Sequence, residues 1–174
     1  LDKIYAAASH DDLMKLFGSI HHQGPAGFGI IPDPADTTRY IAFVGQAGIG
    51  LPDRDYYLKT DGKFPEYRDA YRAYIGKIFD LAGIEGGAAK ADAILAFETK
   101  IAEVHWTQED SRNIQKIYNP MTAAQLAALA PEMNWALMFD NLGLASVPTY
   151  LVAQPSAIDK EAALFAAADP AFLR

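Results

Sequence analysis

Four histidines are the first candidates for metal chemistry in this sequence: His10, His21, His22 and His105. A helical zinc site of the His-Glu-x-x-His kind needs two histidines four residues apart, with a glutamate directly after the first. None of the four is followed by Glu, and no pair has this spacing. We therefore expect no zinc or haem site built from this chain alone. His21 and His22 are expected at a helix C-terminus, where they are favourably aligned with the helix dipole.

Nucleophile motifs are equally absent from the sequence. The chain has no cysteine, which also excludes a disulfide scaffold and a thiolate metal site. It has no Gly-x-Ser-x-Gly elbow. Gly45, Gly48 and Gly50 are spaced like a phosphate loop, but no Gly-Lys-Ser/Thr follows, and the segment continues into Leu51 and Pro52. A tight turn that needs glycine backbone freedom is the preferred interpretation.

Three charged residues in a row, Asp53, Arg54 and Asp55, form the first carboxylate cluster. The proline before them can start a short helix, and acidic side chains are favourable at a helix N-terminus. We expect the cluster to pin a chain reversal that anchors Tyr56 and Tyr57 in the core, in preference to binding a ligand.

Glu98 is the second carboxylate candidate, because it lies on the apolar stripe of a predicted helix, between Ile94 and Ile101. A carboxylate there must be paired or hydrogen-bonded. Arg54 or Arg112 is the expected partner, and a buried ion pair is preferred over a general base. The Glu98→Ala substitution should then destabilise the fold.

The elements that would position these residues begin with a helix capped by Ser9, with Asp12 completing an approximate capping box. Its apolar positions continue to Ile20, and it is expected to stop at Gly24. Two β-favouring runs, residues 27–31 and 39–44, are predicted to form a hairpin, and the turn formers of residues 32–38 would make a long loop between them.

Two long helices are predicted next, over residues 64–82 and from Gly86-Gly87 to about His105, packed antiparallel. The first should bury one face, made of Phe64, Tyr67, Tyr71, Tyr74, Ile78 and Leu81. Further expected elements are a brief turn or helix at Thr107, an extended segment over residues 118–122, helices over residues 123–130, 134–142 and 156–168, and a lone strand over residues 147–153. The predicted fold class is mainly α: a helical lobe with antiparallel long helices, a short β-hairpin and minor strands.

The chain has 174 residues, 51% of them hydrophobic, and a formal net charge of −7. This length suits one domain, or one lobe of a larger protein. Its nine Phe, nine Tyr and two Trp exclude intrinsic disorder, and the acidic balance argues against nucleic acid as a main partner. No apolar run is long enough to span a membrane. The chain starts at Leu1 and stops soon after a helix start at Asp169, so we expect a piece of a longer protein.

One segment carries a family resemblance: residues 45–58, Gly-Gln-Ala-Gly-Ile-Gly-Leu-Pro-Asp-Arg-Asp-Tyr-Tyr-Leu. It resembles the Gly-Leu-Gly-Leu-Pro-x-Arg-Asp-Tyr-Tyr signature of the neprilysin and endothelin-converting-enzyme family of zinc metallopeptidases. The hairpin before it, the helix around Glu98, Arg112 and the run Tyr118-Asn119-Pro120-Met121-Thr122 follow in the family's order. The resemblance covers nearly the whole chain.

The resemblance implies a two-lobed, mainly helical endopeptidase of short peptides, whose catalytic lobe carries His-Glu-x-x-His and a downstream Glu ligand. This sequence lacks these motifs. Residues 1–174 are therefore expected to belong to the helical lobe that covers the cavity and sieves substrates by size. No catalytic, cofactor-binding or metal residue is carried over. The motif residues are expected to be structural, namely Gly48, Gly50, Leu51, Pro52, Arg54, Asp55, Tyr56, Tyr57, Glu98 and Arg112.

The expected partners are the catalytic lobe of the same chain and, for the parent enzyme, short peptide substrates. Zinc is expected in the parent enzyme but not on this piece, which should be inactive alone. Vertebrate members of the family are rich in disulfides, so the missing cysteines and the alanine bias suggest a bacterial member. An extracytoplasmic location is favoured over a cytoplasmic one. The alternative hypothesis is a non-enzymatic helical module that offers an apolar groove to a protein partner.

Overall fold

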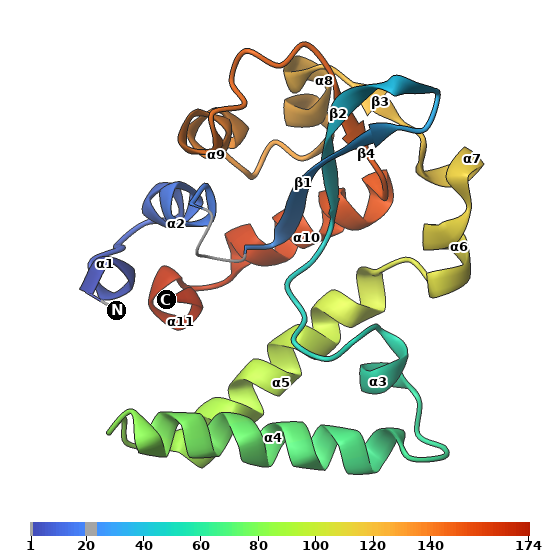
Figure 1. Ribbon diagram of the computed structural model, residues 1–174. Coiled ribbons are helices and arrows are strands. Elements are labelled where there is room, and N and C mark those ends of the chain that lie inside the picture. Colours follow the sequence, from blue (N-terminus) through green and yellow to red (C-terminus); the bar gives the residue numbers. More distant parts are fainter. Residues whose placement is uncertain (1, 20–23) are drawn as a thin grey trace. The chain divides into compact units, whose positions relative to one another are not determined.

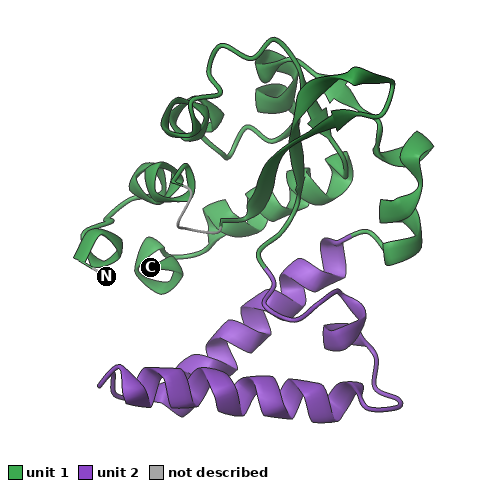
Figure 2. Ribbon diagram, in the orientation of Figure 1, with its two compact units in different colours: residues 1–48, 106–174 green, residues 49–105 purple. Residues whose placement is uncertain are grey.

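The computed structural model describes residues 2–19 and 24–174. The chain divides into two compact units, residues 1–48 with 106–174 and residues 49–105 (Figure 2). The second unit is thus an insertion in the sequence of the first. Unit 1 contains the helices α1 (Asp2–Tyr5), α2 (His10–Phe17), α6 (Gln108–Arg112), α7 (Ile114–Ile117), α8 (Ala123–Leu129), α9 (Trp135–Leu142), α10 (Pro155–Ala167) and α11 (Pro170–Leu173). Unit 2 contains α3 (Asp55–Leu58), α4 (Phe64–Leu81) and α5 (Gly87–Val104).

Unit 1 also holds a four-stranded mixed sheet, built from β1 (Ala26–Asp33), β2 (Asp36–Gln46), β3 (Pro120–Met121) and β4 (Tyr150–Val152) (Figure 1). The strand order is β1-β2-β4-β3, with β4 parallel to β2 and antiparallel to β3. The predicted fold class, mainly α with a hairpin and minor strands, is confirmed. The expectation of a lone strand near residue 150 is wrong, because β4 is a central strand. Its three residues are buried, as expected of a strand covered on both faces.

The hairpin β1–β2 is confirmed, but its predicted long loop is wrong. The strands extend to Asp33 and Asp36, which pair with each other and leave a two-residue connection. Asp33 is fully buried and accepts hydrogen bonds from the Ala35 backbone N–H at 2.9 Å and from the Arg39 guanidinium at 2.7 Å. The Ala35 N–H, assisted by Arg39, holds the pKa of Asp33 below its ordinary value. Residues that look like loop formers therefore tighten the turn through side-chain contacts.

Helix α2 begins as predicted and ends earlier. Ser9 caps it by accepting a hydrogen bond from the Asp12 backbone N–H. Gly18 provides its C-cap, so the helix does not continue to Gly24. A Cβ at Gly18 would lie 2.7 Å from the Asn141 Cβ, so there is no space for a side chain at this end of the helix. The expected apolar position Ile20 and the paired histidines of residues 21–22 lie outside the described residues.

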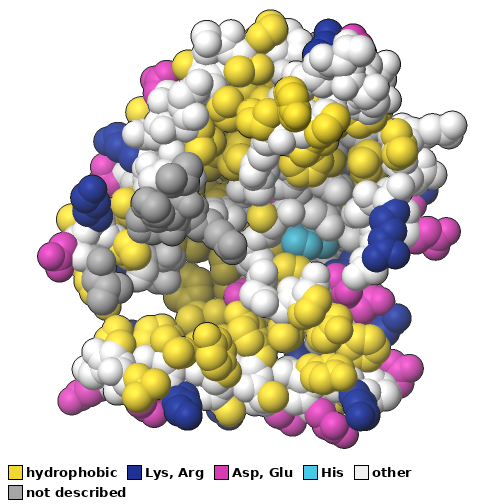
Figure 3. Space-filling view, viewed as in Figure 1, with side chains coloured by type: hydrophobic (Ala, Val, Ile, Leu, Met, Phe, Trp, Pro, Cys, Tyr) yellow, Lys and Arg dark blue, Asp and Glu magenta, His cyan; other side chains and the backbone are white. Residues whose placement is uncertain are grey.

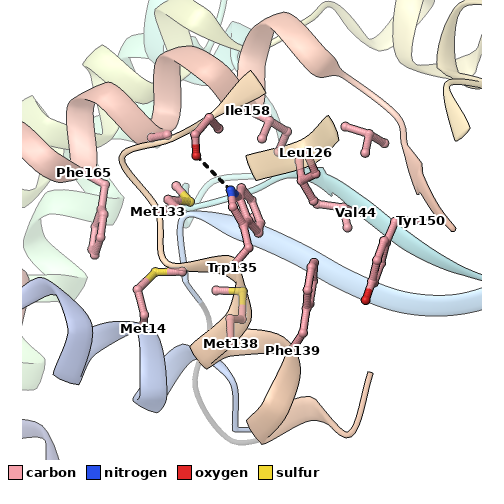
Figure 4. Close-up of a cluster of buried hydrophobic side chains, with 14 of the residues drawn as sticks. Met14, Val44, Leu126, Met133, Trp135, Met138, Phe139, Tyr150, Ile158 and Phe165 are labelled. Atoms are coloured by element: carbon pink, nitrogen blue, oxygen red, sulfur yellow. Dashed lines mark hydrogen bonds between the residues drawn. The ribbon is translucent and has the colours of Figure 1, made fainter. Parts of the chain in front are cut away.

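The core of unit 1 forms between the sheet and helices α2, α8, α9 and α10 (Figure 4). Phe139 of α9 stacks on Tyr150 of β4, with ring centroids 4.2 Å apart. Trp135 is also buried, and its indole N–H donates to the Ala130 carbonyl oxygen at 2.9 Å. Large aromatic side chains dominate the energy of such cores. The helices in this cluster are thereby fixed against β2 and β4.

The helices of the C-terminal half follow the capping signals of the sequence. Thr122 and Gln125 form a capping box for α8, and Asn134 caps α9. Thr107 caps α6, and α10 lies within one residue of its predicted bounds. The short helix α7, which Asn113 caps, was not predicted, because four residues are too few for a helical period to repeat.

Unit 2 is an antiparallel helical hairpin, α4 and α5, joined to the short helix α3. Both long helices are confirmed, and Gly83 ends α4 with a φ of +70°. The predicted apolar face of α4 is only partly buried. Tyr74 and Leu81 are 60% and 74% exposed, whereas Ile75 is the buried position. Hydrophobic side chains are accordingly numerous on the visible surface of unit 2 (Figure 3).

Candidate functional site

Inside unit 2, the part of the motif over residues 49–57 contacts Glu98 of α5. The Tyr57 hydroxyl accepts hydrogen bonds from the backbone N–H groups of Gly50 at 3.0 Å and Leu51 at 2.8 Å. It donates to the Glu98 Oε2 atom at 2.7 Å. The Tyr71 hydroxyl of α4 donates to the Glu98 Oε1 atom at 3.0 Å. One carboxyl group therefore joins the motif loop, α3, α4 and α5.

The arginine partner expected for Glu98 is wrong. Two tyrosine hydroxyls occupy its two oxygens, and Arg54 instead donates from Nε to the Ala102 carbonyl oxygen at 3.3 Å. Arg112 lies exposed on α6. The argument from burial correctly indicated that Glu98 must be hydrogen-bonded. It could not identify the donors, which are 41 and 27 residues away in the sequence.

Burial dominates the electrostatics of this cluster. It raises the pKa of Glu98, and hydrogen bonds from Tyr57, Tyr71 and the Gly50 backbone act in the opposite direction. Burial also raises the pKa values of both tyrosine hydroxyls, and the neighbouring Glu98 carboxyl adds to this effect. The two tyrosines are therefore neutral hydrogen-bond donors at physiological pH.

Two positions of the motif, Gly48 and Gly50, require glycine for steric reasons. Gly48 has a φ of +85°, a left-handed conformation that side chains disfavour. Gly50 approaches Tyr71 so closely that a Cβ would lie 1.9 Å from its hydroxyl oxygen. The preferred interpretation of the glycine spacing, a tight turn, agrees with these two positions. The loop uses the missing side chain to bring its backbone to the tyrosines.

The remaining motif residues tie α3 to its surroundings. Asp53 Oδ1 accepts from the Asp55 backbone N–H at 2.8 Å, and Asp55 pairs with Lys59 at 2.7 Å. The Tyr56 ring contacts Phe64, with centroids 5.3 Å apart. Leu51 and Pro52 lie in the turn that precedes α3, and Pro52 is exposed. The short helix begins at Asp55 rather than directly after Pro52.

Arg68 of α4 is an anchor that sequence reasoning missed. Its guanidinium Nη1 donates to the carbonyl oxygens of Tyr56 at 2.8 Å and Lys59 at 2.7 Å, which are at the end of α3. Tyr71 was assigned only to an apolar face, although its hydroxyl completes the Glu98 cluster. The usable signal was helical spacing, since residues 64, 68, 71 and 75 fall on one side of a helix.

The hydrogen bonds of the cluster connect the Glu98 carboxyl group, two tyrosine hydroxyls and the loop backbone. Both Glu98 oxygens are engaged by tyrosine hydroxyls, whereas a general base must reach a substrate proton. The described residues contain no group of three or more His, Asp or Glu side chains that could hold a metal ion. His10 Nε2 contacts the carbonyl oxygens of Phe165 and Ala168, and His105 is buried. A catalytic zinc does not fit the residues that the structure describes.

Across residues 2–19 and 24–174, no helix combines the length and the hydropathy that crossing a bilayer requires.

The sequence model of peptidase family M13 matches residues 1–174. Neprilysin-3 of Drosophila melanogaster is 34% identical over 117 residues, which cover 66% of this chain and 15% of that protein. Endothelin-converting enzyme 1 of Cavia porcellus is 36% identical over 109 residues, 59% of this chain and 14% of that protein.

A solved structure gives the same result over almost the whole chain. The Mycobacterium tuberculosis zinc metalloprotease Zmp1, in complex with an inhibitor, superposes with a TM-score of 0.89 and 30% identity. The match covers 99% of this chain and 27% of that chain.

These findings define a chain from a family of zinc metallopeptidases with a mainly helical fold. The chain belongs to peptidase family M13. It spans about a seventh of the length of the curated relatives that it matches.

Proposed function

We propose that this chain is part of a zinc metalloendopeptidase that cleaves short peptides. In this proposal, residues 1–174 belong to the helical lobe that covers the active-site cavity and restricts the size of substrates. The observation that supports it most is the match of the whole chain to family M13, together with the TM-score of 0.89 to a zinc metalloprotease.

The zinc ion would be held by another part of the parent protein. The described residues offer no suitable group of ligands, and the carboxyl group of Glu98 is enclosed by tyrosines. The chain by itself is accordingly proposed to be inactive. Its motif residues would act as structural elements that set the shape of the lobe. Arg112, which is exposed on α6, stays a proposed member of that motif without a described role.

The parent protein provides the test. It should hydrolyse unstructured peptides of increasing length, with the rate falling sharply once the peptide exceeds the capacity of the cavity. A chelator should abolish hydrolysis, and added zinc should restore it. Chelator-resistant hydrolysis would refute the peptidase proposal, and equal rates on short peptides and on a folded protein would refute the size restriction.

A second candidate function, a non-enzymatic interaction module, has one observation in its favour. The exposed large side chains of α4, including Tyr74 and Leu81, form a surface suited to contact with another polypeptide. The sequence of the parent gene discriminates: a downstream His-Glu-x-x-His motif supports the peptidase, and its absence supports the module. We further propose a bacterial source and an extracytoplasmic location, both inferred from the family resemblance.

A further inference from the structure

Unit 1 contains a groove of about 570 Å³ beside the N-terminal end of α9. Its floor is apolar, because it includes Met133, Trp135 and Phe139, which are only 3%, 3% and 2% exposed. Figure 4 shows these three side chains in one cluster, with the Trp135 indole fixed by its hydrogen bond. Small residues of α8, Ala123 and Ala127, form part of the wall and leave room for another side chain.

The rim of the groove has one sign of charge. Asp11, Glu132 and Asp140 line it and are exposed, and none of the described lining residues is Lys, Arg or His. Asn134 holds part of this rim in place. Its Nδ2 atom donates to Asp11 Oδ1 at 3.3 Å, while its Oδ1 atom accepts from the Leu137 backbone N–H at 3.3 Å. The negative charge is thus fixed around a preformed apolar floor.

We propose that this groove binds a peptide segment in which a lysine or arginine adjoins an apolar side chain. The apolar side chain would contact the floor, and the cationic group would pair with the rim carboxylates. A bare metal ion is a poorer match, since the described residues contain no group of acidic side chains close enough to hold one. The proposal concerns binding and does not depend on the peptidase activity of the parent.

The test measures fluorescence anisotropy of short capped peptides that carry a dye, titrated with this chain and with the parent protein. The probes are a Leu-Lys-Leu-Arg peptide, its Leu-Glu-Leu-Glu counterpart and its neutral Leu-Gln-Leu-Gln counterpart. The basic peptide should bind saturably and more weakly as salt increases. The other two should bind more weakly than the basic one at low salt.

Two variants make the test specific to the groove. The double substitution Glu132→Gln and Asp140→Asn should lower the affinity for the basic peptide about three- to tenfold, as expected for loss of exposed ion pairs. The double substitution Glu103→Gln and Glu109→Gln, which removes two negative charges at exposed positions outside the groove, should leave the affinity unchanged. Unchanged melting temperatures would establish that both variants fold.

Three outcomes would overturn the proposal. They are equal binding of the acidic and basic peptides, equal loss of affinity in the rim and control variants, and binding by this chain but not by the parent. The last result would mean that another segment of the parent covers the groove. Failure of the peptidase assay, in contrast, would leave this binding result unaffected.

Discussion

At the scale of single residues, Tyr57 and Glu98 are the centre of the hydrogen-bond network that holds the motif loop. The Tyr57 hydroxyl accepts two backbone hydrogen bonds from the motif loop and donates one to Glu98. Because Tyr57 is only 5% exposed, water does not readily replace a partner that a substitution removes from this cluster. The motif is therefore held by a shared hydrogen-bond network rather than by an ion pair.

Glu98→Ala should destabilise the protein by about 1–3 kcal/mol, since it leaves the hydroxyls of Tyr57 and Tyr71 without their acceptor. Glu98→Gln, which keeps one acceptor oxygen at similar size, should lose less. Urea unfolding monitored by circular dichroism provides the comparison. A Glu98→Ala variant as stable as the unmodified chain would show that the network contributes nothing to the free energy of unfolding.

The raised pKa of Glu98 predicts a pH dependence with a defined sign. The folded state binds the Glu98 proton more tightly than the unfolded chain does, because the pKa of Glu98 in the unfolded chain is the ordinary value of 4.5. The stabilisation that protonated Glu98 contributes is fully present below the unfolded-state pKa. It is lost as the pH rises through the pKa of the folded state. The stability of the unmodified protein relative to Glu98→Gln should thus fall as the pH rises above the ordinary glutamate pKa of 4.5. A pH-independent difference, or one that grows with pH, would contradict the raised pKa.

Gly50→Ala tests the close approach of the loop to α4. The new Cβ would lie 1.9 Å from the Tyr71 hydroxyl oxygen, so the loop or Tyr71 must move and the bond to Glu98 is strained. We expect a loss of about 1–3 kcal/mol, the usual cost of overpacking. Gly76→Ala is the matched control, because its nearest neighbour would be 3.8 Å away and alanine favours a helix. Equal melting temperatures for the two variants would refute the steric argument.

At the scale of elements, Gln46 connects the two segments of unit 1 at the point where the chain leaves this unit and returns to it. The chain leaves this unit after residue 48 and returns at residue 106. The Gln46 side chain donates to the Trp106 carbonyl oxygen at 3.2 Å and accepts from the Trp106 backbone N–H at 2.7 Å. Gln154 Oε1 accepts from the Gln46 backbone N–H at 3.1 Å. These hydrogen bonds thereby join the end of β2 to Trp106, although residues 49–105 lie between them in the sequence.

Gln46→Ala should release the Trp106 amide, and hydrogen exchange at that position should accelerate while exchange within α9 stays unchanged. The expected loss of stability is about 1–3 kcal/mol, because two backbone groups lose their partner. Gln115→Ala, on the exposed surface of α7, is the control. Unaltered protection of the Trp106 amide would mean that water or neighbouring groups replace Gln46 fully.

Local signals in the sequence were sufficient for most elements and insufficient for their pairing. The cap at Ser9 identified where α2 begins, and the helical periods of α4 and α5 identified those helices near their observed bounds. The central position of β4 depends on contacts with β2, more than 100 residues earlier, and no local pattern contains that information. The Glu98 cluster follows the same rule. Burial predicted a partner, but only the fold selects tyrosine over arginine.

At the scale of the whole molecule, the chain consists of two compact units. The described residues provide a packed mixed unit, a helical hairpin and a buried hydrogen-bond cluster, and they offer no group of zinc ligands. The chain belongs to peptidase family M13, a family of zinc metallopeptidases. Our central proposal is that the metal and the hydrolytic chemistry belong to another part of the parent protein.

Zinc stoichiometry tests this claim most directly. Equilibrium dialysis of this 174-residue chain and of the parent protein against the same dilute zinc buffer, followed by elemental analysis, measures bound zinc per molecule. The account predicts a single tightly bound zinc ion in the parent and no stoichiometric zinc on this chain. Stoichiometric tight binding by this chain, or a parent that binds no zinc, would contradict it.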